Sequence, residues 1–268
     1  MLVSITAIVF MVFSLLLIFL FPIGLIIFMY RKYGISFKAL LVGAAVFMIF
    51  QFLTRIPLLA VLGRQPWYEP LAQNLFFNAV IIGGLTAGLF EETGRYLGFR
   101  YVLKNDLSWE NGIAYGIGHG GIEAVGLVGL NYINNIVLSL MINSGIFDSI
   151  IVPQIGEAAA GQIKNVLIAT PPVDFLLGGV ERVLAITVHL AFSLIVLYAV
   201  MNRKIIFLFA AILLHAVLNA PAVILLARGY STWAVELYVF LFAVAATVFI
   251  VKSKRLFQPE QAAVDDLD

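Results

Sequence analysis

The feature that most restricts the fold is a series of apolar stretches, each long enough to cross a lipid bilayer as a helix. The first runs from Leu2 to Tyr30 and contains no charged residue. A transmembrane helix needs about 20 predominantly apolar residues. Further stretches of this kind lie at 37–62, 75–103, 109–141, 175–201, 205–227 and 232–251. We therefore predict an all-α protein, a polytopic transmembrane helical bundle of about seven spans.

The composition supports a membrane protein. Hydrophobic residues make up 62% of the sequence and charged residues 12%, whereas charged residues make up about a quarter of a typical soluble domain. The net charge is +1 and the sequence contains no long basic run, so we expect the lipid bilayer as a partner and no nucleic acid. Because cysteine is absent, disulfides, thiol catalysis and cysteine-ligated metals are excluded.

We predict one transmembrane domain, residues 1–252, followed by a polar cytoplasmic tail, residues 253–268. Lysines and arginines concentrate in the connections that would share one side of about seven spans, which is the cytoplasmic side by the usual charge bias. This distribution predicts an outside N-terminus and a cytoplasmic C-terminus. Residues 154–169 have the pattern of an amphipathic helix that lies on the membrane surface and ends before Pro171.

Two carboxylates and a guanidinium interrupt the third apolar stretch. Glu91, Glu92 and Arg95 lie within it, and a charged side chain in hydrocarbon costs at least about 2.5 kcal/mol, so such residues indicate a functional site. Arg95 follows Glu91 by one helical turn and can pair with it. Small residues at 84, 87, 94 and 98 lie on the Glu91 side of the helix and favour Glu91 as the inward-facing acid. Which glutamate contacts water stays open, because adjacent positions differ by only about 100°.

The histidines of the chain fall at the depth of these carboxylates. Measured from the nearest basic loop, Glu92, His119, His189 and His215 each lie about 12 to 15 residues into a helix, which places them within roughly 5 Å of one another in height. Each of two further polar residues follows a histidine by one helical turn and projects from the same face; these are Glu123 and Asn219. The spacing predicts a single polar layer.

Such a layer suits the activation of water. A carboxylate can take a proton from water while a histidine or a metal polarises it, and Asn or His can donate to the oxyanion of a tetrahedral intermediate. Three histidines with carboxylates would also satisfy a catalytic Zn²⁺ that keeps one position open for water. We therefore predict metal ligation by His119, His189 and His215. A His-Glu-x-x-His helix, as in zincins, is absent from the sequence.

The sequence resembles a known family at these positions. Glu91-Glu92-Thr93-Gly94-Arg95, Gly116-Ile117-Gly118-His119-Gly120-Gly121-Ile122-Glu123, His189 and His215-Ala216-Val217-Leu218-Asn219 are similar to the motifs of the YhfC family of intramembrane metalloproteases. They are more distantly similar to the CAAX-processing and bacteriocin-immunity proteases and to PrsW. Compared with the common CAAX pattern, Arg95 comes one residue early, and Glu123 and His189 are additions.

The resemblance implies an intramembrane endopeptidase of a bacterial plasma membrane, with a membrane-associated peptide or protein as its substrate. It implies that Glu91 and His119 activate water and that His215 and Asn219 stabilise the oxyanion. The full set of predicted catalytic residues is Glu91, Glu92, His119, Glu123, His215 and Asn219, with Zn²⁺ as the candidate cofactor.

The same residues are compatible with other functions. A proton- or metal-coupled transporter could use the Glu/His layer as an ion site, although the helix-breaking prolines at 22, 57 and 221 do not border the acid pair. A non-catalytic immunity or binding protein could keep the fold. The acids could also be structural, with Glu91 paired to Arg95.

Overall fold

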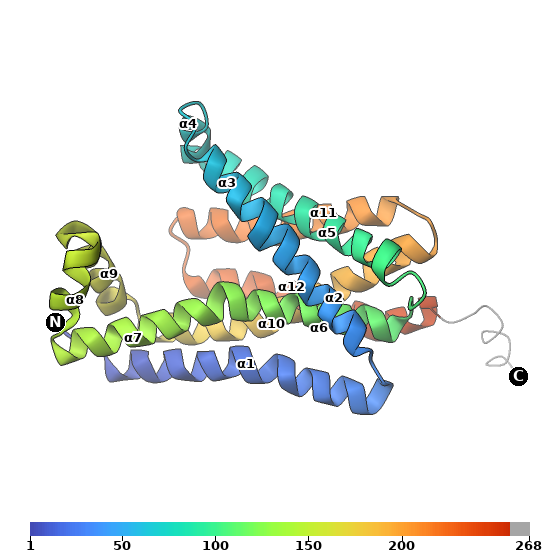
Figure 1. Ribbon diagram of the computed structural model, residues 1–268, viewed down its shortest axis with the longest axis horizontal. Coiled ribbons are helices and arrows are strands. Elements are labelled where there is room, and N and C mark those ends of the chain that lie inside the picture. Colours follow the sequence, from blue (N-terminus) through green and yellow to red (C-terminus); the bar gives the residue numbers. More distant parts are fainter. Residues whose placement is uncertain (258–268) are drawn as a thin grey trace, which may run out of the picture. The chain divides into compact units, whose positions relative to one another are not determined.

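The structure is a computed structural model that describes residues 1–257, and every regular element in that part of the chain is helical (Figure 1). The all-α prediction is therefore confirmed. Several elements follow one another without a break; α marks α-helical segments, η1 to η4 are wider π-helical segments, and η5 is a tighter 3-10 segment. The elements are α1 (Ile5–Tyr33), α2 (Phe37–Phe47), η1 (Met48–Arg55), α3 (Ile56–Leu62), α4 (Glu69–Gln73), η2 (Phe77–Thr86), α5 (Ala87–Leu97), η3 (Gly98–Val102), α6 (Trp109–Glu123), η4 (Ala124–Gly129), α7 (Leu130–Ser144), α8 (Phe147–Ile155), α9 (Glu157–Ala169), α10 (Pro172–Met201), α11 (Ile206–Ala227), α12 (Thr232–Ser253) and η5 (Lys254–Phe257).

The described chain contains 6 helices that are long and apolar enough to cross a membrane. They are Ile5–Tyr33, Phe37–Leu62, Trp109–Ser144, Pro172–Met201, Ile206–Ala227 and Thr232–Phe257. The predicted third span is also helical, from η2 through α5 to η3, but its charged residues lower its mean hydropathy and it is not among the six. The prediction of about seven spans is therefore close. The predicted tail from residue 258 onward lies outside the described residues.

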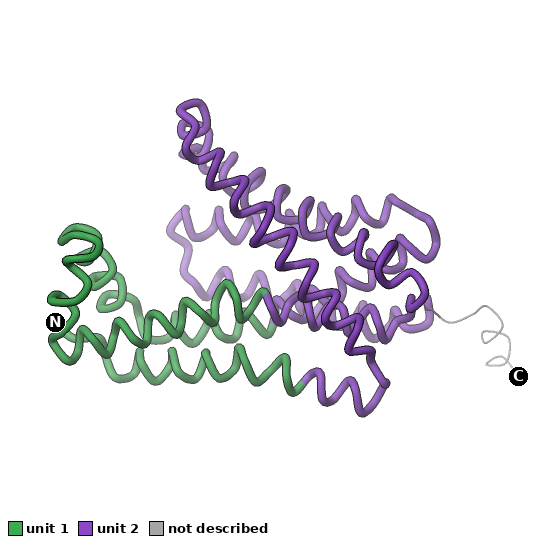
Figure 2. The backbone as a smooth tube through the Cα atoms, viewed as in Figure 1, with its two compact units in different colours: residues 1–24, 123–183 green, residues 25–122, 184–268 purple. Residues whose placement is uncertain are grey.

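The chain forms two compact units (Figure 2), which we describe separately. Unit 1 consists of Met1–Gly24 and Glu123–Val183, and unit 2 consists of Leu25–Ile122 and the chain from Leu184 onward. The single-domain organisation and the orientation of the termini stay predictions.

Unit 1 is held together by hydrogen bonds from side chains to backbone carbonyls. The hydroxyls of Ser14 and Tyr132 both donate to the carbonyl oxygen of Phe175, at 2.7 and 2.6 Å.

The predicted start of the amphipathic helix 154–169 is wrong, because α9 begins at Glu157. Gly156 has a φ of 82°, a left-handed conformation that glycine adopts readily, and it separates α8 from α9.

Unit 2 depends on close approach between helix backbones. A Cβ atom at Gly118 would lie 1.9 Å from the carbonyl oxygen of Leu40, and one at Gly88 would lie 2.7 Å from that of Ile212. Side chains cannot fit at these distances, so glycine lets α6 contact α2 and α5 contact α11, as small residues do in membrane helices. These contacts fix the helices that carry the candidate site.

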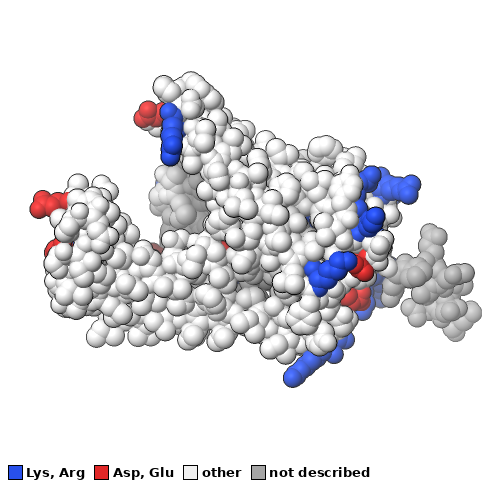
Figure 3. All heavy atoms as spheres, viewed as in Figure 1, with Lys and Arg blue, Asp and Glu red and all other residues white. Residues whose placement is uncertain are grey.

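The surface of the molecule agrees with a lipid environment. Large apolar side chains are exposed along the helices, for example Leu41 at 64% and Leu241 at 59%. On the face drawn in Figure 3, Lys and Arg gather at the right-hand end of unit 2, next to the last described residues. Apolar flanks with basic residues at a helix end are typical of an integral membrane protein.

Candidate active site

Helix α5 carries both glutamates and the arginine, and three other helices of unit 2 bring one histidine each to the same place. Every one of these six side chains is at most 4% exposed; they are Glu91, Glu92, Arg95, His119 on α6, His189 on α10 and His215 on α11. The ring centroids of His119 and His189 are 4.8 Å apart, and those of His189 and His215 are 5.7 Å apart. The structure thus brings together the residues predicted to share one layer. We call these six residues the Glu/His cluster.

Glu91 contacts two of the histidines and a glutamine. Its Oε2 lies 3.1 Å from Nε2 of His119 and 3.8 Å from Nε2 of His215. Its Oε1 accepts a hydrogen bond of 3.3 Å from Nε2 of Gln51. Glu91 therefore lies beside ring nitrogens of His119 and His215.

Glu92 is the partner of Arg95, which corrects the expectation that Arg95 pairs with Glu91. Arg95 Nε lies 2.9 Å from Glu92 Oε2, and Nδ1 of His215 lies 2.9 Å from Glu92 Oε1. The arginine side chain reaches back three residues along the helix instead of four. Glu92 is thus fixed between a cation and an imidazole.

The Arg95 guanidinium is at the centre of the Glu/His cluster. Its Nη1 donates to the backbone oxygen of His189 at 3.0 Å and to the hydroxyl of Ser193. Its Nη2 lies 3.3 Å from Nε2 of His119 and 3.3 Å from Nδ1 of His189. A single side chain therefore connects α5, α6 and α10.

Three members of the Glu/His cluster fit a metal ion in type and spacing. Glu91, His119 and His189 each offer a ligand atom, and these atoms lie within 4.8 Å of one another. Nδ1 of His119 is buried and has no hydrogen-bond partner within residues 1–257, although buried polar atoms are almost always paired. Two imidazoles and a carboxylate are a known ligand set for catalytic zinc.

The third histidine predicted as a ligand lies differently. His215 faces the two carboxylates through its two ring nitrogens. Its ring also stacks on Phe192, with centroids 5.3 Å apart. His215 is therefore better placed to orient Glu91 and Glu92 than to complete a metal site with the other two histidines.

Two further predicted residues have other partners. Asn219 donates from Nδ2 to the backbone oxygen of Gly83 at 3.2 Å, which directs its amide toward η2. Glu123 is the last residue of α6, one turn beyond His119, and within unit 1 its Oε1 lies 3.3 Å from Nη1 of Arg182. Catalytic roles for both residues stay predictions.

Two further residues, Gln51 and Ser193, support the site and were not predicted. Gln51 is buried in η1, contacts Glu91, and accepts a hydrogen bond of 3.1 Å from Arg55. Ser193, one turn after His189, contacts Arg95. The sequence does contain an indication of Gln51. It lies one helical turn before Arg55 in an otherwise apolar stretch, and polar residues at this spacing share one face of a helix.

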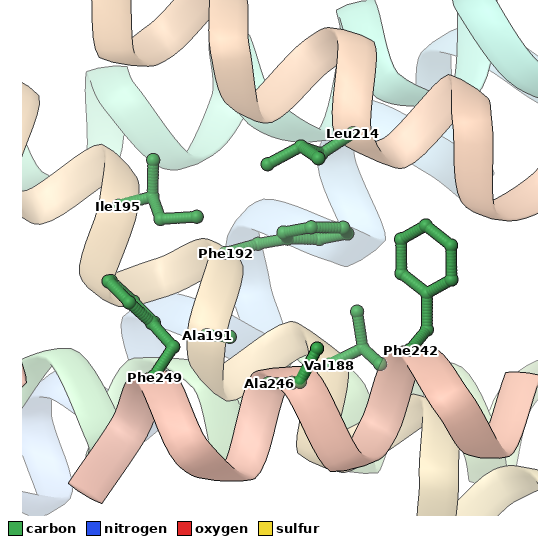
Figure 4. A pocket seen from close by; sticks show the side chains of 9 residues that line it. Val188, Ala191, Phe192, Ile195, Leu214, Phe242, Ala246 and Phe249 are labelled. Atoms are coloured by element: carbon green, nitrogen blue, oxygen red, sulfur yellow. The ribbon is translucent and has the colours of Figure 1, made fainter. Parts of the chain in front are cut away.

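An apolar pocket of about 250 Å³ is lined by Phe192, the residue whose ring stacks on His215 (Figure 4). Val188, Ala191, Phe192 and Ile195 of α10 line one side, Leu214 of α11 lines another, and Phe242, Ala245, Ala246 and Phe249 of α12 close it. Phe192 therefore contacts both a member of the Glu/His cluster and an apolar space.

Fold and site together define a polytopic membrane protein with a Glu/His cluster buried among its helices. The model of the family described as YhfC intramembrane metalloprotease matches residues 16–239, and the chain belongs to this family. The chain is 42% identical over 260 residues to the "Uncharacterized membrane protein YhfC" of Bacillus subtilis (strain 168), an alignment that covers 96% of this chain and 100% of that protein. No solved structure matches the chain. The predicted family and the predicted integral membrane location are thus confirmed.

Proposed function

We propose that this protein is an intramembrane endopeptidase that hydrolyses a peptide bond of a membrane-associated protein or peptide. The observation that carries the proposal is the contact of 3.1 Å between Glu91 Oε2 and His119 Nε2, both buried within the membrane helices. A carboxylate next to an imidazole can remove a proton from water and return it to the leaving group. The family description supports the same activity.

In the proposed reaction, Glu91 accepts a proton from water while the water oxygen attacks the carbonyl carbon of the scissile peptide. Glu91 passes this proton across the 3.1 Å contact to His119. His119 delivers it to the departing amide nitrogen as the C–N bond breaks. The carboxylic acid that forms gives its proton to the released amine, so that a carboxylate and an ammonium group result. Gln51, which donates to Oε1 of Glu91, keeps the other carboxylate oxygen directed at His119. Each transfer occurs between groups within hydrogen-bond reach, as general acid–base catalysis requires.

Glu92, Arg95 and His215 are positioning residues in this proposal. Arg95 links the helices of Glu92, His119 and His189, and His215 links Glu92 to Glu91. Because none of these side chains is more than 4% exposed, a substrate reaches the Glu/His cluster only when neighbouring helices separate.

If zinc is bound, Glu91, His119 and His189 would hold it, and the zinc would polarise water or the scissile carbonyl as a Lewis acid; proton transfer by Glu91 and His119 describes the protein without zinc. We expect about one zinc per chain in protein purified without chelator. The His119→Ala/His189→Ala double variant should lose that zinc, whereas His215→Ala should retain it. Elemental analysis by mass spectrometry measures the content. Equal zinc in native and double-variant protein would contradict this ligand set without affecting the peptidase proposal.

The activity can be tested before a substrate is known. The native protein and a His119→Ala variant are reconstituted separately with a bacterial membrane-protein fraction, and new protein N-termini are quantified by mass spectrometry. We expect peptide termini that appear with native protein and fall by about 10²-fold or more with the variant. If the same termini appear at the same rate with both proteins, the proposed function is wrong.

A further inference from the structure

A second pocket, with a mainly polar lining, lies at the end of unit 2 where η3 ends and α11 begins. Its volume is about 590 Å³, and its polar lining consists of two tyrosines and three cations. These residues are Tyr96, Tyr101, Arg100, Lys104 and Arg203. No member of the Glu/His cluster lines this pocket, so it calls for a separate explanation. We call it the cationic pocket.

Within residues 1–257, no carboxylate lines the cationic pocket. Within the described chain, Arg100, Lys104 and Arg203 form no ion pair. Other basic residues of unit 2 do form them, as Lys38 does with Asp106 at 2.6 Å. Arg100 instead donates from Nη1 to the hydroxyl of Tyr96 at 3.1 Å. Three cations around one hollow, without a carboxylate, favour an anionic occupant.

The backbone of Arg203 provides an independent observation. Its φ is 55°, and within residues 1–257 no other residue except glycine has a positive φ. Its backbone N–H donates a hydrogen bond of 3.3 Å to the carbonyl oxygen of Val200. The backbone N–H of Lys204 donates one of 3.0 Å to the carbonyl oxygen of Ala199. This pattern ends a helix at a position that usually holds glycine or asparagine. Here an arginine adopts the uncommon conformation, and its side chain lines the cationic pocket.

We propose that the cationic pocket binds a phosphate group, namely that of an anionic membrane lipid. The planar guanidinium groups of Arg100 and Arg203 match the oxygens of a phosphate, and Lys104 adds a point charge. Two tyrosines beside basic residues at the end of membrane helices are typical of the depth where headgroups lie. Ile205, which also lines the pocket, directly precedes α11, and the N-terminus of a helix favours a negative charge. Free phosphate offers the same chemistry, so the test separates the two sources.

The test uses the full-length protein in non-ionic detergent. Binding of phosphatidylglycerol and of phosphatidylcholine is measured by native mass spectrometry, and binding of inorganic phosphate by equilibrium dialysis. The test variant is Arg100→Gln/Lys104→Gln/Arg203→Gln. The matched control is Lys204→Gln/Lys252→Gln/Arg255→Gln, which removes the same charge from exposed positions outside the pocket lining.

We expect native protein and the control to bind phosphatidylglycerol at least about tenfold more tightly than phosphatidylcholine, and the test variant to lose that preference. Ile205→Trp should fill the pocket without removing charge and should lose the preference too, which keeps the test valid if the triple variant does not fold. Binding of inorganic phosphate with the same dependence on the variants, but no preference between the lipids, would identify free phosphate as the source. The proposal is overturned if control and test variants lose binding equally, if Ile205→Trp binds as native protein does, or if neither probe binds native protein.

Discussion

Replacement of Glu91 by glutamine should reduce peptide cleavage by about 10² to 10⁴-fold, the usual contribution of a general base. Glutamine has nearly the same shape and can still bond His119 and Gln51, the residues that contact Glu91 at 3.1 and 3.3 Å. It cannot, however, take a proton from water. We therefore expect native folding without activity. The measurement is the rate of product formation in proteoliposomes, with a substrate found by the comparison of N-termini.

Two variants serve as controls for Glu91→Gln. Glu69→Gln changes an exposed acid on α4 and should leave the rate unchanged. Glu92→Gln removes the negative charge that pairs with Arg95 and should lower the free energy of unfolding. Any loss of activity in this variant should therefore accompany a loss of stability. If Glu91→Gln cleaves at the native rate, while Glu92→Gln folds normally and is inactive, the roles of the two glutamates are the reverse of those proposed.

The sequence sufficed to predict the helices and the shared layer because both follow from one-dimensional quantities. The lengths of the apolar stretches predict the spans, and the distance along each helix from the basic loops predicts the depth of Glu92, His119, His189 and His215. The glycines near His119 similarly indicate close packing before a partner helix is known.

The pairing within the layer could not be predicted in this way. Arg95 can reach residues three or four positions back with nearly equal ease, and His189, Ser193 and His215 on two other helices determine that it takes Glu92. The break at Gly156 has a similar explanation, because an isolated glycine is compatible with a continuing helix until the packing of α8 and α9 decides its φ.

Replacement of Arg95 by methionine should lower the free energy of unfolding by about 3–5 kcal/mol, the usual effect of removing one partner of a buried ion pair. Arg95 and Glu92 are both 0% exposed, so water cannot replace the lost guanidinium. The carboxylate of Glu92 would keep its contact with His215 but lose the guanidinium that balances its charge, and the link from α5 to His189 and Ser193 would be lost. Titration of unfolding with SDS in mixed micelles measures the change.

The double variant Glu92→Leu/Arg95→Met separates the charge imbalance from the loss of packing. Because both charges are removed together, we expect it to recover most of the lost stability, as uncharged replacements of buried pairs often do. Arg64→Gln, at an exposed position, should change the free energy of unfolding by no more than about 0.5 kcal/mol. If Arg95→Met lowers the free energy of unfolding by no more than Arg64→Gln does, the cation is not needed to balance the charge of Glu92. The central position of Arg95 would then require another explanation, such as a direct contact with the substrate.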